Sequence, residues 1–529
     1  MADKVDASYA YVLVTTKSAS DAIDDNLTEI FDTDLDSIAF SSNISDDITW
    51  NQSAGTFTFV NGGVYHIILT AITSQETSNR LQTTAFNLNS AAAFYTGESF
   101  VGAAGSANYD PVETTHQKVI LIAAGDVLHI KTQTAGGGVN HDMGIEKGTS
   151  LIITKITSGV FSSATVTTNG SGTDEDEHNP YDTNLSGGPV ISALSSGITW
   201  TGTEGSMTVP SDGKYLIMIT NFHAETQGGD NTNIDVTIKL KSNSDILYTG
   251  STRVNHTDDP TESTICVVED LDADDVLTVT WNIGGTGNNV FACKGSTITV
   301  YKLLEGSSCH TVPTKRGQDL YISVVNKATM TPTAAEVNPF QDSAAADNYS
   351  SPNFDTRTTN GITYAMASGT FTVSEPGFYF VMWNPIFQAT NDAIVTMKIL
   401  INGVAKVTAD TPQVDSYPDP LNRSLSAFLR LGEYDAITVT MDSDSPTVGH
   451  NAGSHMTIFR YYPFLSNDSV ADGLINNDFT IDTFSQGNLS AQYERNIAQV
   501  PFKLGIRGAG TLRGRCARPS VVKLGDKKN

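Results

Sequence analysis

The sequence is poor in the features that mark disulfide-rich, zinc-binding or membrane-spanning proteins. Its 529 residues include only four cysteines, and Cys266, Cys293, Cys309 and Cys516 show no paired CxxC spacing. A disulfide scaffold or a zinc site is therefore not expected, nor is any cofactor. No apolar signal-peptide core follows the polar residues 1–6, and no run approaches the length of a membrane span. We expect a protein made in a cytoplasm without a signal peptide and without a membrane partner.

Basic residues are also scarce. Lys and Arg number 31 against 58 Asp and Glu, so the net charge is −27. An acidic surface repels phosphate groups, which makes nucleic acid an unlikely partner for the body of the protein. We interpret the charge as keeping a Thr-rich β protein soluble, with recruitment of cations to acidic loops as the alternative.

Catalytic signatures are missing as well. The sequence contains no GxSxG, HExxH, phosphate-binding loop or GxGxxG-after-strand pattern, so we expect no enzyme activity. His450 and His455 flank the turn at Gly453, but no third ligand is evident, and we interpret them as surface-loop residues. A glycan-active enzyme is kept only as a remote alternative, because paired carboxylates occur everywhere in an acidic chain.

Three acidic clusters are candidate cation sites. Residues 32–36 resemble the start of a calcium loop, but the Gly at position six and the Glu at position twelve are absent. Residues 174–177 and 270–275 are also rich in Asp and Glu. Because acidic turns are common between strands, we predict no metal site, and calcium binding by these loops stays an open alternative.

The most informative feature is a repeat. Residues 48–65, 198–215 and 362–379 align without gaps, and each segment begins with Ile-Thr-aromatic. Counted from that Ile, each has Gly seven and fifteen places on and Tyr seventeen places on. The shared positions, predicted to be structural, are Gly55, Gly63, Tyr65, Gly205, Gly213, Tyr215, Gly369, Gly377 and Tyr379.

The repeat has a readable local structure. Alternation in residues 56–59 predicts a strand with one buried face. A Gly-containing turn follows, in which we expect Gly63 and its counterparts to supply a positive φ. The next strand, residues 65–69, is more apolar. The pattern therefore predicts a hairpin whose second strand is buried more deeply.

Two further blocks recur in the same order and define the modules. Residues 119–130 are strand, acidic turn and strand, and residues 148–153 form a closing Gly-(Ser/Thr)-x-apolar strand. Each module then has about eight to ten short strands, which predicts an all-β protein of three tandem antiparallel jelly-roll sandwiches. The predicted boundaries are 1–156, 157–305 and 318–463, with a linker at 306–317 and an extended arm at 464–529.

Together, these blocks resemble the jelly roll of the tumour-necrosis-factor and complement-globular-head family. Gly125-Asp126-Val127-Leu128 is the closest match to the family's Gly-Asp turn. The resemblance implies a ten-strand sandwich that forms compact trimers through an aromatic-lined face. Either three chains form a homotrimer, or the three modules of one chain form an intrachain pseudo-trimer.

The C-terminal arm reverses the charge of the chain. From residue 503 onward, eight basic residues oppose one Asp, a net charge of +7. We predict that this segment anchors the protein to an acidic partner surface, with a solvated tail or a nucleic-acid-binding arm as alternatives. The candidate anchoring residues are Lys503, Arg507, Arg513, Arg515, Arg518 and Lys523.

Three such modules in one acidic chain resemble bacteriophage and viral exterior proteins. The leading hypothesis is a virion structural protein, decorating the capsid or built like a head fibre, whose arm binds the major capsid protein or another virion protein. The alternative is a tail-fibre or adhesin-type protein for host attachment, which recognises a host glycan or surface protein. Trp50, Trp200 and Tyr364 are candidate sugar-stacking residues, although their matched positions indicate core packing first.

Overall fold

The computed structural model describes most of the chain up to Tyr462. The described residues are 8–18, 27–75, 80–101, 112–135, 143–170, 177–184, 188–225, 234–254, 261–283, 290–303, 320–326, 336–341, 354–388, 394–410, 421–443 and 448–462. All regular secondary structure in this part is β-strand, which confirms the predicted all-β class. Within it, no helix is long and apolar enough to cross a membrane.

The strands form three sandwiches in chain order. Sandwich 1 comprises β1 (Tyr9–Thr16), β2 (Thr28–Glu29), β3 (Ala39–Ile44), β4 (Ile48–Asn51), β5 (Thr56–Phe59), β6 (Gly63–Gln75), β7 (Arg80–Leu88), β8 (Tyr95–Val101), β9 (Val112–Ile122), β10 (Val127–Ala135), β11 (Met143–Ile145) and β12 (Ser150–Lys155). Sandwich 2 comprises β13 (Phe161–Thr168), β14 (Val190–Ser196), β15 (Thr199–Thr201), β16 (Ser206–Thr208), β17 (Gly213–Glu225), β18 (Ile234–Ser242), β19 (Asp245–Val254), β20 (Thr261–Leu271), β21 (Val276–Ile283), β22 (Val290–Ala292) and β23 (Thr297–Lys302). Sandwich 3 comprises β24 (Tyr321–Asn326), β25 (Phe354–Asn360), β26 (Ile362–Ala365), β27 (Thr370–Val373), β28 (Gly377–Asn384), β29 (Ile386–Gln388), β30 (Val395–Ile401), β31 (Val404–Asp410), β32 (Leu421–Asn422), β33 (Leu425–Leu431), β34 (Ala436–Ser443), β35 (Gly449–His450) and β36 (His455–Tyr462).

Each sandwich consists of two antiparallel sheets with the same strand order. In sandwich 1 the order is β3-β1-β12-β6-β9 in one sheet, here called the inner sheet, and β4-β5-β10-β7-β8 in the outer sheet. Sandwich 2 repeats it as β14-β13-β23-β17-β20 and β15-β16-β21-β18-β19. Sandwich 3 repeats it as β25-β24-β36-β28-β33 and β26-β27-β34-β30-β31. This is a jelly roll of ten principal strands. Of the remaining short strands, β2, β11 and β22 pair with β10, β6 and β17, and β29, β32 and β35 form a small separate sheet.

The predicted hairpins at the repeat are wrong. β5 pairs with β4 and β10 in the outer sheet, whereas β6 pairs with β9 and β12 in the inner sheet. The Gly-containing turn therefore carries the chain from one sheet to the other. The acidic turn between β9 and β10 makes a second crossing of this kind. β6 is buried more deeply than β5 because the two strands belong to different sheets, not because they are the two strands of one hairpin.

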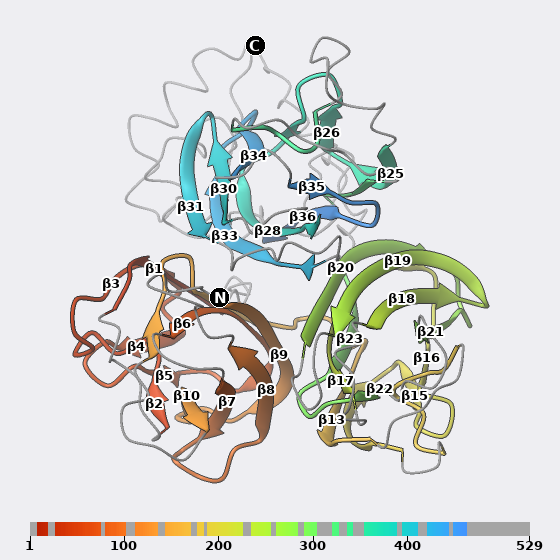
Figure 1. Ribbon diagram of the computed structural model, residues 1–529, viewed down its shortest axis with the longest axis horizontal. Helices are drawn as coiled ribbons and strands as arrows, with labels where there is room; N and C mark the ends of the chain where they lie inside the picture. The colour runs from red at the N-terminus through yellow and green to blue at the C-terminus, as the bar shows by residue number, and fades with distance from the viewer. Residues whose placement is uncertain are drawn as a thin grey trace, which may run out of the picture.

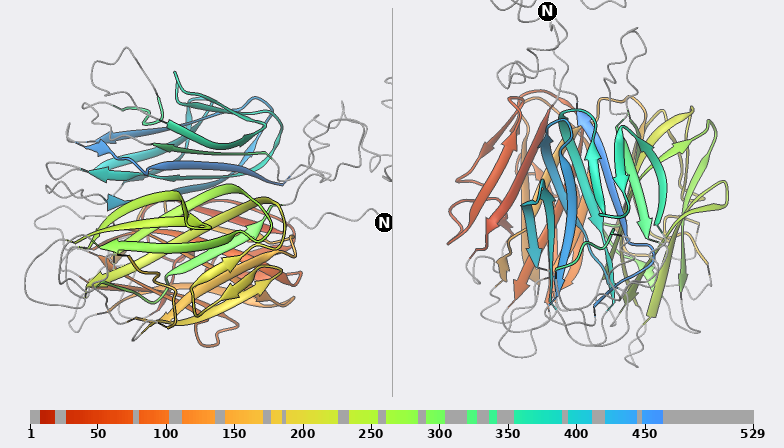
Figure 2. Two further views of the ribbon diagram at one scale, coloured as in Figure 1. Left: turned by 90° about the vertical axis from the view of Figure 1, so that its right-hand side faces the viewer. Right: turned by 90° about the horizontal axis from the view of Figure 1, so that it is seen from above.

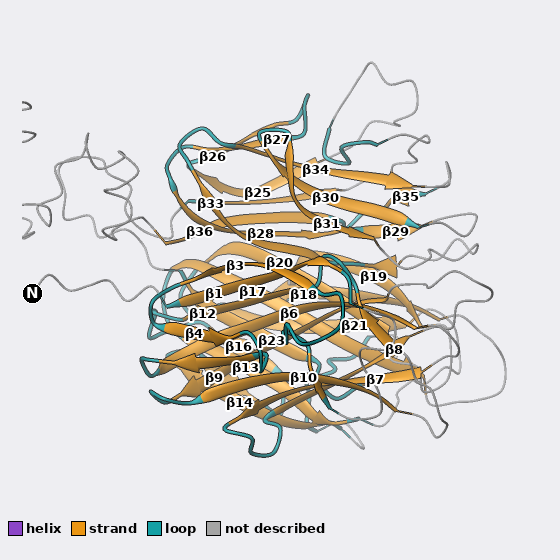
Figure 3. Cartoon of the chain, turned by 90° about the vertical axis from the view of Figure 1, so that its left-hand side faces the viewer, coloured by secondary structure: helices purple, strands orange, loops and turns teal. Residues whose placement is uncertain are grey.

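The three sandwiches lie around a common centre, so the chain has an approximate threefold axis (Figure 1). The strands of all three sandwiches are aligned roughly with that axis (Figure 2 and Figure 3). Sandwiches 1 and 2 each have a core of their own, as the separate clusters around Phe57 and Trp281 show, whereas the core of sandwich 3 is part of a shared cluster. A larger cluster joins residues of all three sandwiches, among them Tyr11, Met218 and Phe380.

The inner sheets are buried on both faces. Along β1, residues Tyr9 to Val14 are all buried, with alternate side chains in two different clusters. Val12 packs into the core of sandwich 1, whereas Tyr11 packs into the cluster shared by the three sandwiches. Full burial of an apolar side chain contributes roughly 1.5–3 kcal/mol, so the shared cluster stabilises the association substantially. The continuous apolar runs in the inner strands follow from this two-sided burial.

The strand register places both ends of the described body at one face of the molecule. Tyr9 pairs with Thr154 beside the start of β6, and Tyr462 pairs with Phe378 beside the start of β28. The connection from β12 to β13 also lies here, because Ile156 donates its backbone N–H to the carbonyl of Val64. We call this the chain-end face.

Candidate functional site

The repeated tyrosines close the turn at which the chain changes sheets. Tyr65, Tyr215 and Tyr379 are fully buried. In each copy the phenol hydroxyl donates a hydrogen bond to the backbone carbonyl four residues earlier, at 2.8, 2.7 and 2.6 Å in sandwiches 1, 2 and 3. A buried hydroxyl requires such a partner, and an open turn carbonyl supplies one. These positions are structural.

The first repeated glycine has a left-handed backbone and no room for a side chain. The φ angles of Gly55, Gly205 and Gly369 are 64°, 56° and 61°. A Cβ at Gly205 would lie 2.6 Å from the carbonyl carbon of Tyr181, in the loop that packs over the turn. Glycine is therefore the residue that this position accepts without strain.

The second repeated glycine corrects our expectation. Gly63 and Gly377 do not have a positive φ, whereas Gly213, at 151°, has the positive φ that we expected. These residues begin β6, β17 and β28 and lie in the ladders rather than in the turn. A Cβ at Gly63 would lie 2.5 Å from Cε of Lys155 on the adjacent strand β12. This atom lies at the far end of a flexible side chain that can move aside, so this contact does not by itself require glycine at position 63.

The acidic turn contains an Asp–Asn pair, here called the clamp, which sequence reasoning missed. Asn89 donates from Nδ2 to Oδ1 of Asp126 at 2.7 Å, and its Oδ1 accepts the backbone N–H of Val127. The clamp ties the turn between β9 and β10 to the turn between β7 and β8. Its equivalents are Asn243 with Asp275 and Asn402 with Asp435. All three Asn residues have a positive φ, which Asn tolerates better than most residues.

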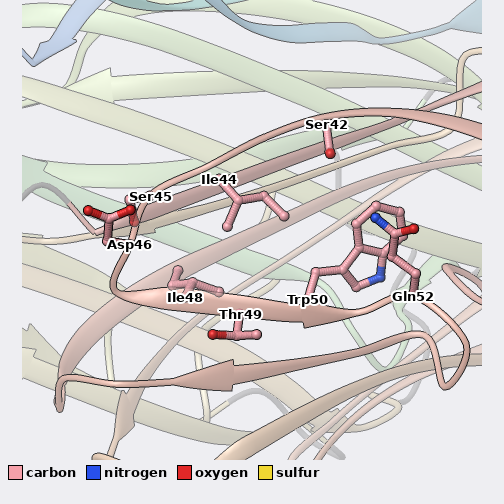
Figure 4. A pocket seen from close by; sticks show the side chains of 8 residues that line it. All are labelled: Ser42, Ile44, Ser45, Asp46, Ile48, Thr49, Trp50 and Gln52. Atoms are coloured by element: carbon pink, nitrogen blue, oxygen red, sulfur yellow. The ribbon is translucent and has the colours of Figure 1, made fainter. Parts of the chain in front are cut away.

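A shallow groove opens on sandwich 1 between β3 and β4, with a volume of about 500 Å³. Figure 4 shows Ser42 and Ile44 on one strand, Thr49 and Trp50 on the next, and Asp46 in the turn between them. That turn has three residues, 45–47, whereas β25 and β26 in sandwich 3 are separated by one glycine. The longer turn places an exposed carboxylate at one end of the groove.

The matched aromatic residues are primarily structural, as predicted. The indole Nε1 of Trp50 donates to the carbonyl of Phe31 at 3.2 Å, and its ring stacks on Phe57 with an interplanar angle of 8°. Tyr364 repeats the arrangement in sandwich 3, where its hydroxyl donates to the carbonyl of Phe340. Trp200 is likewise half-buried. Trp50 differs in lining the groove as well.

The contacts between sandwiches have a polar layer near the middle of the inner sheets, and its chemistry differs at each interface. Gln117 of sandwich 1 donates from Nε2 to the carbonyls of Met218 and Thr297 in sandwich 2, at 3.0 and 3.3 Å. At the equivalent place, Cys266 of sandwich 2 donates its backbone N–H to Nε2 of His455 in sandwich 3, at 3.1 Å.

The third interface of this layer uses hydroxyl groups only. Ser426 of sandwich 3 lies 3.0 Å from the Oγ1 of Thr70 and 3.1 Å from the Oγ of Ser150, both in sandwich 1. The three residues that define this layer, Gln117, Cys266 and Ser426, occupy equivalent positions on β9, β20 and β33. In each sandwich the glycine that begins β6, β17 or β28 pairs with a residue of the neighbouring strand, and the layer residue lies five positions before that paired residue.

A second layer brings two carboxyl groups together inside the molecule. Glu262 of sandwich 2 accepts the backbone N–H of Thr115 in sandwich 1, at 2.5 Å, and Glu113 of sandwich 1 accepts that of Ser424 in sandwich 3, at 2.8 Å. Asn422, at the equivalent position of sandwich 3, instead donates to the carbonyl of Thr264 in sandwich 2, at 3.3 Å.

Burial governs the protonation of these carboxyls. The side chains of Glu113 and Glu262 are 2% and 7% exposed. Burial raises the pKa of Glu113 to about 7, although the positive charge of Arg423 opposes the shift. Burial, and then the charge of Glu113, raises the pKa of Glu262 well above its usual value. Desolvation disfavours the charged form, so this layer prefers protonated carboxyls.

Buried histidines accompany the interface between sandwiches 1 and 2. His66 hydrogen bonds to Oε1 of Gln117 at 3.0 Å, and burial lowers its pKa to about 4. His116 lies 3.0 Å from the hydroxyl of Tyr95, which donates to the carbonyl of Gly295 in sandwich 2. Burial lowers the pKa of His116 to about 3. Both imidazoles are therefore neutral packing groups near pH 7.

The interpretation of His450 and His455 as surface-loop residues is wrong. Both are 1% exposed, because the strands that carry them pack inside sandwich 3 and against sandwich 2. Nε2 of His450 accepts from the indole of Trp383 at 3.4 Å, and Nε2 of His455 accepts from Cys266. Their nitrogens are committed to the protein rather than to a metal ion.

The acidic clusters are used structurally where the chain is described. Asp32 accepts the backbone N–H of Asp34 at 2.8 Å within a turn, and Asp275 belongs to a clamp. Glu177 pairs with Lys241 at 2.6 Å, and this hydrogen bond lowers its pKa to about 2. Residues 174–176 lie outside the described part. Among the described residues, no group of three or more His, Cys, Asp or Glu side chains is placed to hold a metal ion.

Two sets of predicted residues have different outcomes. Cys266 and Cys293 are both buried, and neither is in a disulfide. The six candidate anchoring residues from Lys503 to Lys523 lie outside the described residues, as do Cys309 and Cys516. Their predicted roles remain predictions.

The sheet order defines each sandwich as a jelly roll. Among solved structures, Eiger TNF from S. frugiperda is similar at 14% identity and a TM-score of 0.22, covering 28% of this chain and 96% of the other. Murine APRIL, crystallised at pH 5.0, is similar at 14% identity and a TM-score of 0.19, covering 27% of this chain and 98% of the other. No protein-family model and no curated protein sequence matches the chain.

Proposed function

We propose that this chain is a non-enzymatic virion structural protein that decorates the capsid exterior or forms a head fibre. The observation that carries the proposal is that both chain ends of the body lie at the same face. Both of its ends, Tyr9 and Tyr462, lie at the chain-end face, so the chain leaves the described body there, 41 residues before the basic segment begins at Lys503. A block tethered at one face presents the opposite face outward, which suits a protein attached to a shell.

Charge supports the same function. The segment from residue 503 carries +7, whereas the whole chain carries −27, so the segment is the part suited to an acidic partner surface. The partner would be the major capsid protein or another virion protein. The buried core shared by the sandwiches gives a rigid body to be displayed.

Truncation after Pro463 tests this proposal. The truncated protein is expected to keep its circular dichroism spectrum and its thermal midpoint, but to fail to sediment with particles that lack the native protein. A full-length control with the six candidate anchoring residues changed to Gln separates charge from chain length. Undiminished binding of the truncated protein to particles would refute the anchoring role.

A second candidate function is recognition of a host glycan or surface protein, and the groove on sandwich 1 favours it. The groove combines one aromatic ring, Trp50, with exposed polar groups on Ser42, Asp46 and Thr49. Sugars bind to such combinations of an aromatic platform and hydrogen-bonding groups. A tail-fibre or adhesin-type protein would use the groove in host attachment.

A glycan array with the full-length chain tests this function. Asp46→Ala is expected to reduce binding at least tenfold without changing the thermal midpoint, because Asp46 is exposed. Asp245→Ala, an exposed acid outside the groove, is the matched control. Array binding that is equal for both variants would exclude the groove as the site.

A further inference from the structure

The contacts between sandwiches follow one circular direction. In each contact, the glycine that precedes the closing strand of one sandwich lies against an edge strand of the next. The pairs are Gly295 with Gly97, Gly453 with Thr249, and Gly148 with Ala409. A Cβ at these glycines would lie 2.6, 2.5 and 2.6 Å from the neighbouring sandwich. The backbone geometry is therefore the same at all three interfaces.

The side chains at these interfaces are not interchangeable. The long Gln117 faces Thr220 and the backbone of Thr297, which leave room for it. At the equivalent place, the backbone N–H of Cys266 instead meets the large ring of His455. Placing Gln opposite His would overpack the interface, and placing Cys opposite Thr would leave a void, and both changes destabilise a close-packed contact.

The carboxyl layer adds an electrostatic reason. The chain brings together Glu113, Glu262 and Asn422, so the centre holds two carboxyl groups and one amide. Three copies of sandwich 1 would bury three copies of Glu113, and three copies of sandwich 2 would bury three copies of Glu262. An additional buried carboxyl without a partner is costly. In this chain Asn422 stands in place of a third carboxyl, and the charge of Arg423 opposes the rise in pKa of the other two.

We infer that the three inner faces are mutually specific, so the chain closes a ring with its own sandwiches and does not form a ring of three chains. The partner that fits each inner face is the next sandwich of the same polypeptide. This inference is independent of the proposed virion function, because it concerns the body alone.

The mass of the full-length chain in solution is the first test. Sedimentation velocity and native mass spectrometry over a hundredfold concentration range are expected to give a particle of one chain, 56.4 kDa. A particle of three chains would overturn the inference. The truncation experiment above has a separate readout, particle binding, so the two ideas fail independently.

A double-mutant cycle tests pairwise specificity in the full-length chain. The single substitutions Cys266→Gln and His455→Thr are each expected to disrupt the interface between sandwiches 2 and 3. The double variant places Gln opposite Thr, as Gln117 and Thr297 are placed at the interface between sandwiches 1 and 2. The double variant is expected to recover at least half of the summed loss in thermal midpoint. Cys293→Ser combined with His455→Thr is the control, because Cys293 packs elsewhere in sandwich 2, and its losses should add. Additive losses in the first pair would overturn the inference.

The carboxyl layer has its own test, which does not depend on the folding of those variants. Asn422→Glu introduces a third carboxyl facing Glu113, Glu262 and Arg423, whereas Asn422→Gln introduces an uncharged group of equal size. At pH 8 the Glu variant is expected to have the lower thermal midpoint, and at pH 5 the difference should shrink. Equal midpoints at both pH values would show that the layer does not discriminate between sandwiches.

Discussion

The interior of each sandwich and the interfaces between sandwiches are built by opposite rules. Inside the sandwiches the same residues recur at the same places, as the hydroxyl bonds of Tyr65, Tyr215 and Tyr379 show. At the interfaces one glycine recurs in each copy, but the side chains that meet there differ, as in Gln117, Cys266 and Ser426. Repetition preserves a fold three times, whereas divergence determines which sandwich packs against which.

The largest expected effect is at an interface glycine. Gly295→Ala forces a side chain into φ 99° and against the backbone of Gly97, so we expect a loss of roughly 4 kcal/mol in the free energy of unfolding. Gly125→Ala, with φ 88° and no atom within 4 Å of the added Cβ, should lose only about 1 kcal/mol. Chemical denaturation of both variants measures the difference. Equal losses would mean that the interface is loosely packed.

The next effect is pH-dependent. Burial raises the pKa of Glu113 to about 7, so the folded state binds a proton that the unfolded state releases above its ordinary pKa. Stability from this group is therefore present below about pH 4.5 and declines up to about pH 7.

Glu113→Gln removes that titration and keeps an acceptor for the N–H of Ser424. The variant should match the native protein near pH 4.5 and exceed it by about 3 kcal/mol at pH 8, because a shift of one pKa unit corresponds to about 1.36 kcal/mol. Unfolding curves at four pH values provide the check. A constant difference would contradict the assigned protonation.

A smaller effect is expected at the clamps. Asn243→Ala removes two hydrogen bonds and places Ala at φ 48°, so we expect a loss of about 2 kcal/mol. Asn243→Gly keeps the backbone freedom and should lose about half as much. Thermal unfolding of both variants separates the hydrogen bonds from the backbone strain. If the Gly variant is as unstable as the Ala variant, φ is not a factor.

The smallest effect tests the repetition itself. Tyr65→Phe, Tyr215→Phe and Tyr379→Phe each remove one buried hydroxyl bond and should each cost about 1 kcal/mol. The three losses are expected to agree within about 0.5 kcal/mol because the geometry is the same in all copies. Calorimetry of the three variants is sufficient. Widely different losses would show that the copies are not energetically equivalent.

Several elements were predictable because their signals are local. Period-two alternation identified β5, and an apolar run identified β6 as deeply buried. The left-handed turn at Asn89, Asn243 and Asn402 also has a local signal, because Asn is followed by Ser or Gly in all three copies. Spacing alone could have suggested the clamp, since each Asn lies 32 to 37 residues before its Asp.

Other features depend on partners that are distant in the chain. The groove is lined by two strands and the turn between them, and its one aromatic ring, Trp50, is held by the carbonyl of Phe31 and the ring of Phe57. The burial of His450 and His455 depends on the packing of sandwich 3 against sandwich 2. No local pattern reports such contacts, which is why these histidines looked like loop residues.

The sequence by itself determined that the chain is all-β, that one module occurs three times, and that Gly55 and Tyr65 with their counterparts are structural. Backbone conformation and one-sided burial leave these marks on neighbouring residues. Tertiary structure alone decided that β5 and β6 enter different sheets and that the inner sheets are buried on both faces around a common axis. Strand pairing and contacts between sandwiches join residues more than a hundred positions apart, so each choice depends on the rest of the chain.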